Sequence, residues 1–136
     1  MKNFLIILIM FIFHPVQAAT VRLETSLGDI DLEMREDVAP LTVQNFLNYV
    51  NDGDFNDSTF HRSVPGFILQ GGVFYKENGR LVEIPQDSAV QNEFNLSNLR
   101  GTVAMAKLED QPNSATSSFF INTSNNAANL DNQNGG

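Results

Sequence analysis

Residues 60–72 read FHRSVPGFILQGG and carry more structural information than any other part of this sequence. Two apolar runs, 59–64 and 67–69, flank the break Pro65-Gly66 and predict two short strands. An isolated arginine such as Arg62 is most often a solvated surface charge. Its position inside a long, gapless block of aromatic, amide and glycine residues makes it a candidate for chemistry instead.

Upstream of this block the hydrophobic pattern changes from strand-like to helical. Apolar residues alternate with polar ones in 21–25 and again in 30–34, and the glycine-containing turn at 26–29 separates the two runs. This pattern predicts an antiparallel hairpin with one buried face. Residues 40–50 place apolar side chains at helical spacing behind a proline suited to a first turn, and the turn residues 51–53 end the predicted helix.

Downstream of the block the pattern is weaker. Residues 75–92 are polar and irregular, with an expected exposed turn at 76–79. The apolar runs 101–106 and 118–122 have the length of strands, and we expect both to be buried. Residues 123–136 are so rich in Asn and Gly that they predict a loop or tail.

Composition excludes several classes of protein. The chain has 136 residues with eight Lys and Arg against sixteen Asp and Glu, a net charge of −8 that repels phosphate backbones, so we expect no nucleic-acid partner. It has no cysteine, which excludes disulfides and thiolate zinc sites. His61 is the one histidine after residue 18, and no calcium-loop spacing occurs. We therefore assign no metal and no cofactor.

The first eighteen residues predict a signal peptide. Lys2 precedes the apolar run 4–13, and Val16-Gln17-Ala18 has the small-x-small pattern of a cleavage site. The run is shorter than the about 20 residues that a membrane-spanning helix needs, so a permanent anchor is the weaker alternative. Residues 19–136 then form one exported domain with no membrane association after cleavage.

The sequence resembles the cyclophilins. Besides residues 60–72, four further blocks carry the resemblance in the family's order: 28–30, 39–46, 100–106 and 113–122. The resemblance covers nearly all of residues 19–136 and implies a mainly β fold, a closed eight-stranded antiparallel β-barrel capped by helices. In the family a closing strand and a C-terminal helix follow the position of Gly136, so the resemblance implies that both are missing from this chain.

The activity that the resemblance implies is peptidyl-prolyl cis-trans isomerisation of proline-containing polypeptides. With the signal peptide, it predicts a monomeric folding assistant for exported proteins, in the periplasm or, alternatively, secreted. Arg62 matches the family's catalytic arginine, and Gln70 matches the glutamine that braces it. The matching substrate-binding positions are Phe67, Ile68, Ala106, Lys107, Ser118, Phe120 and Leu130.

Four positions depart from the family pattern. Lys107 replaces an asparagine, and Ser118 replaces a glutamine that helps to position the substrate. Asn129 replaces the aromatic residue that packs on cyclosporin, so we expect weak binding of that drug. Asn134 replaces a histidine of eukaryotic members. Two alternatives to an active enzyme stay open: a proline-peptide binding module or chaperone with weakened catalysis, and an inactive chain with an unclosed barrel.

His61, with Ser63 and Asp57 nearby, could suggest a Ser-His-Asp hydrolase, but the sequence has no nucleophile elbow. The resemblance implies a structural histidine, hydrogen-bonded in the core or barrel wall.

Phe119 and Phe120 are neighbours in a strand and face opposite sides, so at most one can line a site. The resemblance selects Phe120.

Overall fold

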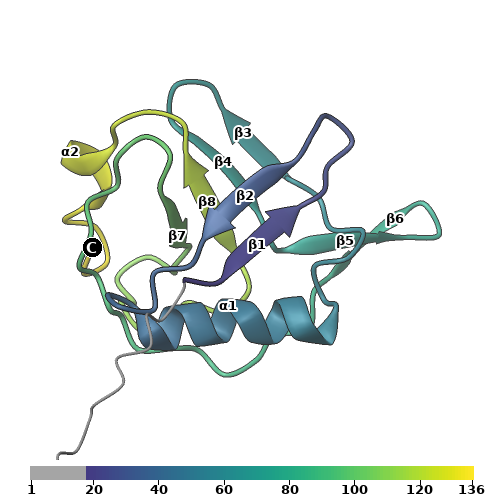
Figure 1. The fold of residues 1–136 in the computed structure, drawn as a ribbon, viewed down its shortest axis with the longest axis horizontal. Helices are drawn as coiled ribbons and strands as arrows, with labels where there is room; N and C mark the ends of the chain where they lie inside the picture. Colours follow the sequence, from purple (N-terminus) through teal and green to yellow (C-terminus); the bar gives the residue numbers. More distant parts are fainter. Residues whose placement is uncertain (1–17) are drawn as a thin grey trace, which may run out of the picture.

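The computed structural model describes residues 18–136, and the predicted signal peptide falls outside this range except for its last residue. Eight short strands and two helices form the fold (Figure 1). Helix α1 (Pro40–Asp52) runs along one side of the strands, at the bottom of the view, and the short helix α2 (Ala127–Leu130) lies at the upper left. Among the described residues no helix is both long enough and apolar enough to span a membrane.

The predicted N-terminal hairpin is confirmed. Strands β1 (Thr20–Leu23) and β2 (Ile30–Glu33) pair antiparallel with Val21 opposite Leu32. Gly28 adopts a φ of 126° in the turn between them, a conformation that suits glycine. On the outer face Arg22 Nε and Asp31 Oδ1 form an exposed cross-strand ion pair at 2.7 Å.

Helix α1 also begins and ends where the sequence predicts. Pro40 occupies the first turn, where a missing N–H costs no helical hydrogen bond. Gly53 follows the last turn in the left-handed conformation, with a φ of 80°, and its N–H closes onto the carbonyls of Tyr49 and Val50. The helix buries one face against the strands through Val43, Asn45, Phe46 and Tyr49.

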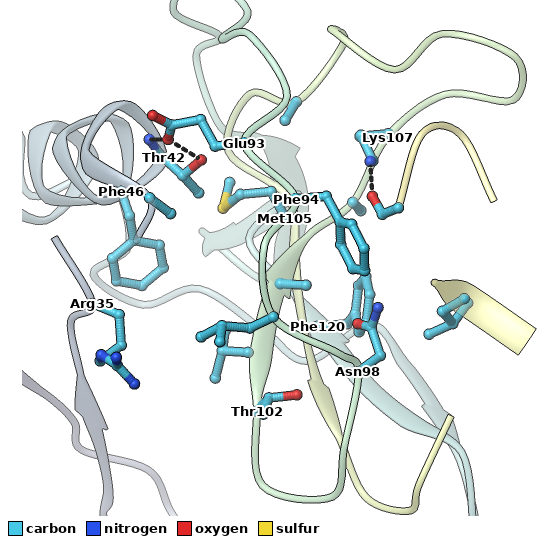
Figure 2. A pocket seen from close by; sticks show the side chains of 18 of the residues that line it. Arg35, Thr42, Phe46, Glu93, Phe94, Asn98, Thr102, Met105, Lys107 and Phe120 are labelled. Atoms are coloured by element: carbon cyan, nitrogen blue, oxygen red, sulfur yellow. Dashed lines mark hydrogen bonds between the residues drawn. The ribbon is translucent and has the colours of Figure 1, made fainter. Parts of the chain in front are cut away.

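The N-terminus of α1 is capped from a distant part of the chain. Ala39, at the N-cap position, has no side-chain oxygen to accept a hydrogen bond. The Glu93 carboxylate accepts instead from the Leu41 N–H at 3.1 Å, the Thr42 N–H at 2.7 Å and the Thr42 hydroxyl at 2.9 Å (Figure 2). Desolvation alone would raise the pKa of Glu93, but these hydrogen bonds outweigh it and hold the pKa below its usual value.

Replacing Glu93 by glutamine is expected to lower the free energy of unfolding at neutral pH by about 0.5–2 kcal/mol, because an amide NH₂ then faces an N–H donor. Since the folded-state pKa is depressed, the stabilisation is complete above the unfolded value near 4.5 and is lost as pH falls through the folded value. Urea unfolding of wild type and Glu93→Gln across this range measures both effects. Glu36→Gln, at an exposed glutamate before the helix, is the matched control. Equal acid sensitivity of wild type and Glu93→Gln would contradict the capping role.

The central sheet has four antiparallel strands in the order β3-β4-β8-β7. Their bounds are β3 (Arg62–Val64), β4 (Ile68–Gly71), β7 (Val103–Met105) and β8 (Phe119–Asn122). All four were predicted as strand segments. The burial of residues 101–106 was overestimated, however, because β7 is an edge strand and Val103 remains 36% exposed.

A second hairpin was missed by the sequence analysis. Strands β5 (Phe74–Glu77) and β6 (Arg80–Glu83) flank the predicted turn, in which Asn78 and Gly79 have φ values of 48° and 79°. The hairpin projects from the molecule (Figure 1), and Leu81 is 59% exposed. Because so much of it faces solvent, it lacks the alternation by which a half-buried strand is recognised.

The mainly β fold implied by the resemblance is confirmed, but the described residues form no closed eight-stranded barrel. Their strands fall into three sheets, β1-β2, β3-β4-β8-β7 and β5-β6. Isolated bridges add to these sheets: one joins Ser58 to Tyr75 on β5, and another joins Val90 to Ala115. The prediction of a loop or tail for residues 123–136 also needs correction, because α2 lies there and Asn126 before it is only 2% exposed.

The core lies between α1, the β1–β2 hairpin and β8. Its buried members are Leu32, Met34, Val43, Phe46 and Phe119. The rings of Phe46 and Phe119 meet edge to face with centroids 5.3 Å apart, an arrangement that aromatic quadrupoles favour. Phe119 thus anchors β8 to the helix and holds the central sheet against the core.

Candidate active site

One cavity of about 740 Å³ gathers the residues singled out by the sequence. Figure 2 shows it from close by, with Phe120, Met105 and Lys107 among the labelled side chains. The predicted site residues that line it are Arg62, Phe67, Ile68, Gln70, Ala106, Lys107, Phe120 and Leu130. Ser118 is the exception. The structure thus brings the predicted set together, while the role of each residue stays a prediction.

Strand register explains why these residues meet. Arg62 on β3 lies opposite Gln70 on β4, Gln70 lies opposite Phe120 on β8, and Phe120 lies opposite Ala104 on β7. Residues directly opposite one another in a sheet share a face. The four side chains therefore form one row across the sheet, and all four line the cavity.

Phe119 and Phe120 face opposite sides of β8, as neighbouring residues in a strand must. Phe119 is 3% exposed and packs in the core, whereas Phe120 lines the cavity. The expectation that only one of them could line the site, and that it is Phe120, agrees with this placement. Ile68 is buried, and it contributes to the apolar lining together with Phe67 and Leu130.

The polar end of the row is held by hydrogen bonds. Arg62 Nη1 donates to Gln70 Oε1 at 3.3 Å, and Gln70 Nε2 donates to Ser118 Oγ at 3.2 Å. Ser118 accepts this hydrogen bond from Gln70 and is absent from the cavity lining. Its expected contact with substrate stays a prediction.

The two glycines of the QGG motif permit close packing. A Cβ on Gly72 would collide with the carbonyl oxygen of Ser117 and lie 2.8 Å from the Phe119 ring, and its φ is +76°. A Cβ on Gly71 would lie 3.0 Å from the Phe60 ring. Gly71 thus allows close packing against Phe60, and Gly72 allows it against the segment 117–119, so the motif has a steric basis as well as a chemical one.

Lys107 and Ala106 are less available to a ligand than the sequence suggests. Lys107 Nζ donates to the carbonyl oxygens of Asn134, at 3.0 Å, and of Gly136, and burial lowers its pKa. The Ala106 N–H donates to the Ser118 carbonyl at 2.8 Å. The Lys107 amino group is therefore hydrogen-bonded to residues 134 and 136, beside the cavity.

A buried amide network supports the site and was missed by the sequence analysis. Asn126 Nδ2 donates to the Phe67 carbonyl at 2.8 Å and to Asn122 Oδ1 at 2.7 Å, and Asn122 Nδ2 donates to Asn98 Oδ1 at 3.1 Å. The Asn98 N–H and side chain bond Asp131, and they lower the pKa of that carboxyl. The network connects the cavity residue Phe67 to α2. Nothing in an Asn-rich stretch distinguishes buried amides from exposed ones in advance.

The prediction that His61 is hydrogen-bonded in the core or barrel wall is wrong. Its side chain is exposed and makes no hydrogen bond among the described residues. The ring stands edge to face on Phe74 with centroids 5.6 Å apart, and partial desolvation, with a contribution from Arg62, lowers its pKa. Residues 18–136 contain no cluster of three His, Cys, Asp or Glu residues that could hold a metal ion.

Comparison with known proteins agrees with this architecture. Residues 20–135 match the family model for cyclophilin type peptidyl-prolyl cis-trans isomerases. The chain is 45% identical over 121 residues to peptidyl-prolyl cis-trans isomerase A of Dickeya dadantii, with 85% of this chain and 62% of the relative covered. It is 44% identical over 108 residues to isomerase B of Escherichia coli, covering 78% of this chain and 63% of that relative.

A solved structure gives the same result for the fold. The cyclophilin type isomerase of Cryptosporidium parvum, determined in the presence of the dipeptide Ala-Pro, superposes with a TM-score of 0.67 at 28% identity, covering 81% of this chain and 71% of that one. The chain spans only about three fifths of the length of the curated relatives named above. Sequence match, fold and arrangement of the cavity agree: the chain belongs to the family of cyclophilin-type peptidyl-prolyl cis-trans isomerases.

Proposed function

We propose that this protein is a peptidyl-prolyl cis-trans isomerase that accelerates rotation about Xaa-Pro bonds in proline-containing polypeptides. The observation that carries the proposal is the row Arg62, Gln70 and Phe120, which puts a guanidinium beside an apolar surface in one cavity. The family membership of residues 20–135 supports the same activity. The reaction makes and breaks no covalent bond, so neither a nucleophile nor a cofactor is needed.

The chemistry follows from the electronic structure of the amide. Rotation must break the amide resonance, at a barrier of ~18–20 kcal/mol. In the twisted state the proline nitrogen becomes pyramidal and regains a lone pair that the planar amide does not offer. Arg62 carries only donors and can hydrogen-bond that lone pair, which stabilises the transition state and leaves the ground state unaffected.

The apolar part of the cavity would bind the proline ring. Phe120, Ile68 and Phe67 supply this surface, and Leu130 lies at its edge. A twisted amide is less polar than a planar one, so an environment that excludes water favours the twisted state. Gln70 accepts a hydrogen bond from Arg62 and keeps the guanidinium at the border of the apolar surface.

The biological setting is part of the proposal. The pattern of residues 1–18 supports export, and the clients would then be exported proteins with slow Xaa-Pro steps, in the periplasm or outside the cell. We infer a monomer from the family resemblance. Asn129 is exposed on α2 and absent from the cavity lining, in keeping with weak cyclosporin binding.

The test is an NMR exchange experiment on the protein with an Xaa-Pro peptide. Uncatalysed isomerisation takes about 10–100 s, so exchange cross-peaks between cis and trans signals on a faster scale report catalysis. Accelerated exchange is the expected result. Peptide-induced shifts without acceleration would contradict the enzyme and favour a proline-peptide binding module. Collapsed amide signals of the protein would mean that this chain does not form the fold by itself.

A further inference from the structure

Ser118 completes a chain of hydrogen bonds that begins at the proposed catalytic arginine. Arg62 Nη1 donates to Gln70 Oε1 at 3.3 Å, Gln70 Nε2 donates to Ser118 Oγ at 3.2 Å, and the Ser118 hydroxyl donates to the Gly71 carbonyl at 3.3 Å. The three side chains contribute a guanidinium, an amide and a hydroxyl. In each of the three hydrogen bonds the donor lies on the Arg62 side and the acceptor on the Gly71 side.

The direction follows from the chemistry of the groups. A guanidinium has no acceptor, so Gln70 must present its oxygen to Arg62. The amide NH₂ then faces Ser118, and the hydroxyl oxygen must accept. The single hydroxyl proton is left to bond the Gly71 carbonyl, which needs a donor. A reversed Gln70 amide would instead point its NH₂ at the guanidinium and place two donors face to face.

The two ends of the series differ in rigidity. Arg62 and its neighbour Ser63 are exposed, and a long exposed side chain has many rotamers available. Ser118 lies between Ser117 and Phe119, which are 1% and 3% exposed, and its carbonyl accepts from the Ala106 N–H at 2.8 Å. Ser118 is thus a fixed point, and the mobile end of the series is the one proposed to meet the substrate.

We propose that Ser118 is a positioning residue that anchors the Gln70 amide in the orientation that Arg62 requires and, through it, fixes the location of the Arg62 guanidinium. This inference rests on the proposed isomerase activity and deepens it. Ser118 lies outside the cavity lining, so it acts through Gln70 and makes no contact with substrate. Ser118 is therefore expected to stabilise the transition state rather than the bound ground state, because Arg62 gains the proline nitrogen as a partner only in the transition state.

The experiment compares Ser118→Ala, which removes the hydroxyl, with Ser118→Thr, which keeps it. Ser118→Ala is expected to lower kcat by about 3- to 10-fold, the effect of losing one neutral hydrogen bond, with KM unchanged. Ser118→Thr is expected to restore most of the rate. Ser63→Ala, at an exposed serine next to Arg62 whose hydroxyl makes no hydrogen bond among the described residues, is the control and is expected to match wild type.

A second readout does not depend on activity. The side-chain NH₂ signals of Gln70 in a ¹H–¹⁵N spectrum report whether the amide is held in one orientation. They are expected to shift in Ser118→Ala and to return towards wild type in Ser118→Thr. A raised KM with unchanged kcat would overturn the proposal and make Ser118 a substrate contact.

Unchanged Gln70 signals in Ser118→Ala would overturn it whatever the kinetics. If wild type proves inactive, the proposed function fails, and shifted Gln70 signals would still support the positioning of the amide. The two failures are therefore distinguishable.

Discussion

Replacing Arg62 by alanine is expected to lower kcat/KM for isomerisation of an Xaa-Pro peptide by ~10²–10³-fold, the usual cost of removing a donor that acts mainly in the transition state. The guanidinium lies on the cavity, hydrogen-bonded to Gln70, and no other described arginine or lysine except Arg35 and Lys107 lines that space. Arg35 is paired with Asp37, and Lys107 bonds the Asn134 and Gly136 carbonyls. Neither is free to replace the lost donor.

The loss should be confined to catalysis. Arg62 is exposed, so its truncation is expected to leave the unfolding transition near that of wild type. Arg80→Ala, at an exposed arginine on the projecting hairpin, is the matched control and is expected to keep full activity. Exchange spectroscopy and urea unfolding of both variants measure the two quantities. Activity of Arg62→Ala within two-fold of wild type would remove Arg62 from the mechanism.

Replacing Gly72 by alanine is expected to be the most destabilising single methyl addition in the motif. A left-handed φ of +76° costs a residue with a Cβ roughly 1–2 kcal/mol. The new Cβ would also collide with the Ser117 carbonyl and the Phe119 ring, and overpacking adds typically ~1–3 kcal/mol. The combined loss of about 2–5 kcal/mol is a large part of the stability of a small domain.

Gly79 separates the two contributions to that loss. Its φ of +79° is nearly the same as that of Gly72, but a Cβ there would have nothing within 4 Å. Gly79→Ala is therefore expected to show the backbone cost alone. Denaturant unfolding of the two variants gives the difference as the steric part. Equal destabilisation by both substitutions would mean that Gly72 is needed only for its backbone conformation.

The elements that the sequence predicted correctly are those with a local physical cause. Alternation of apolar residues predicted β1 and β2, and helical spacing between Pro40 and Gly53 predicted α1 with both ends. The facing rule for Phe119 and Phe120 needed only the geometry of a strand. These signals are complete within a few residues, so tertiary context did not have to supply them.

The elements that were missed depend on partners elsewhere in the chain. The β5–β6 hairpin has weak alternation because it projects into solvent. Helix α2 follows an Asn-rich stretch whose amides look like loop residues until Asn98, Asn122 and Asn126 are seen to bond one another in the interior. His61 was expected inside because of the family resemblance, but its own surroundings leave it exposed.

The sequence by itself determined the N-terminal hairpin, helix α1, the strands of the central sheet, the family and the set of residues that could meet around a proline, because periodicity and motif are properties of neighbouring positions. Only the tertiary structure decided that Glu93 caps a helix 51 and 52 residues away and that Ser118 holds Gln70 across 48 residues. Hydrogen bonds between distant residues are set by strand register and by the packing of α1 on the sheets. No local pattern encodes which donor will face which acceptor once the chain has folded.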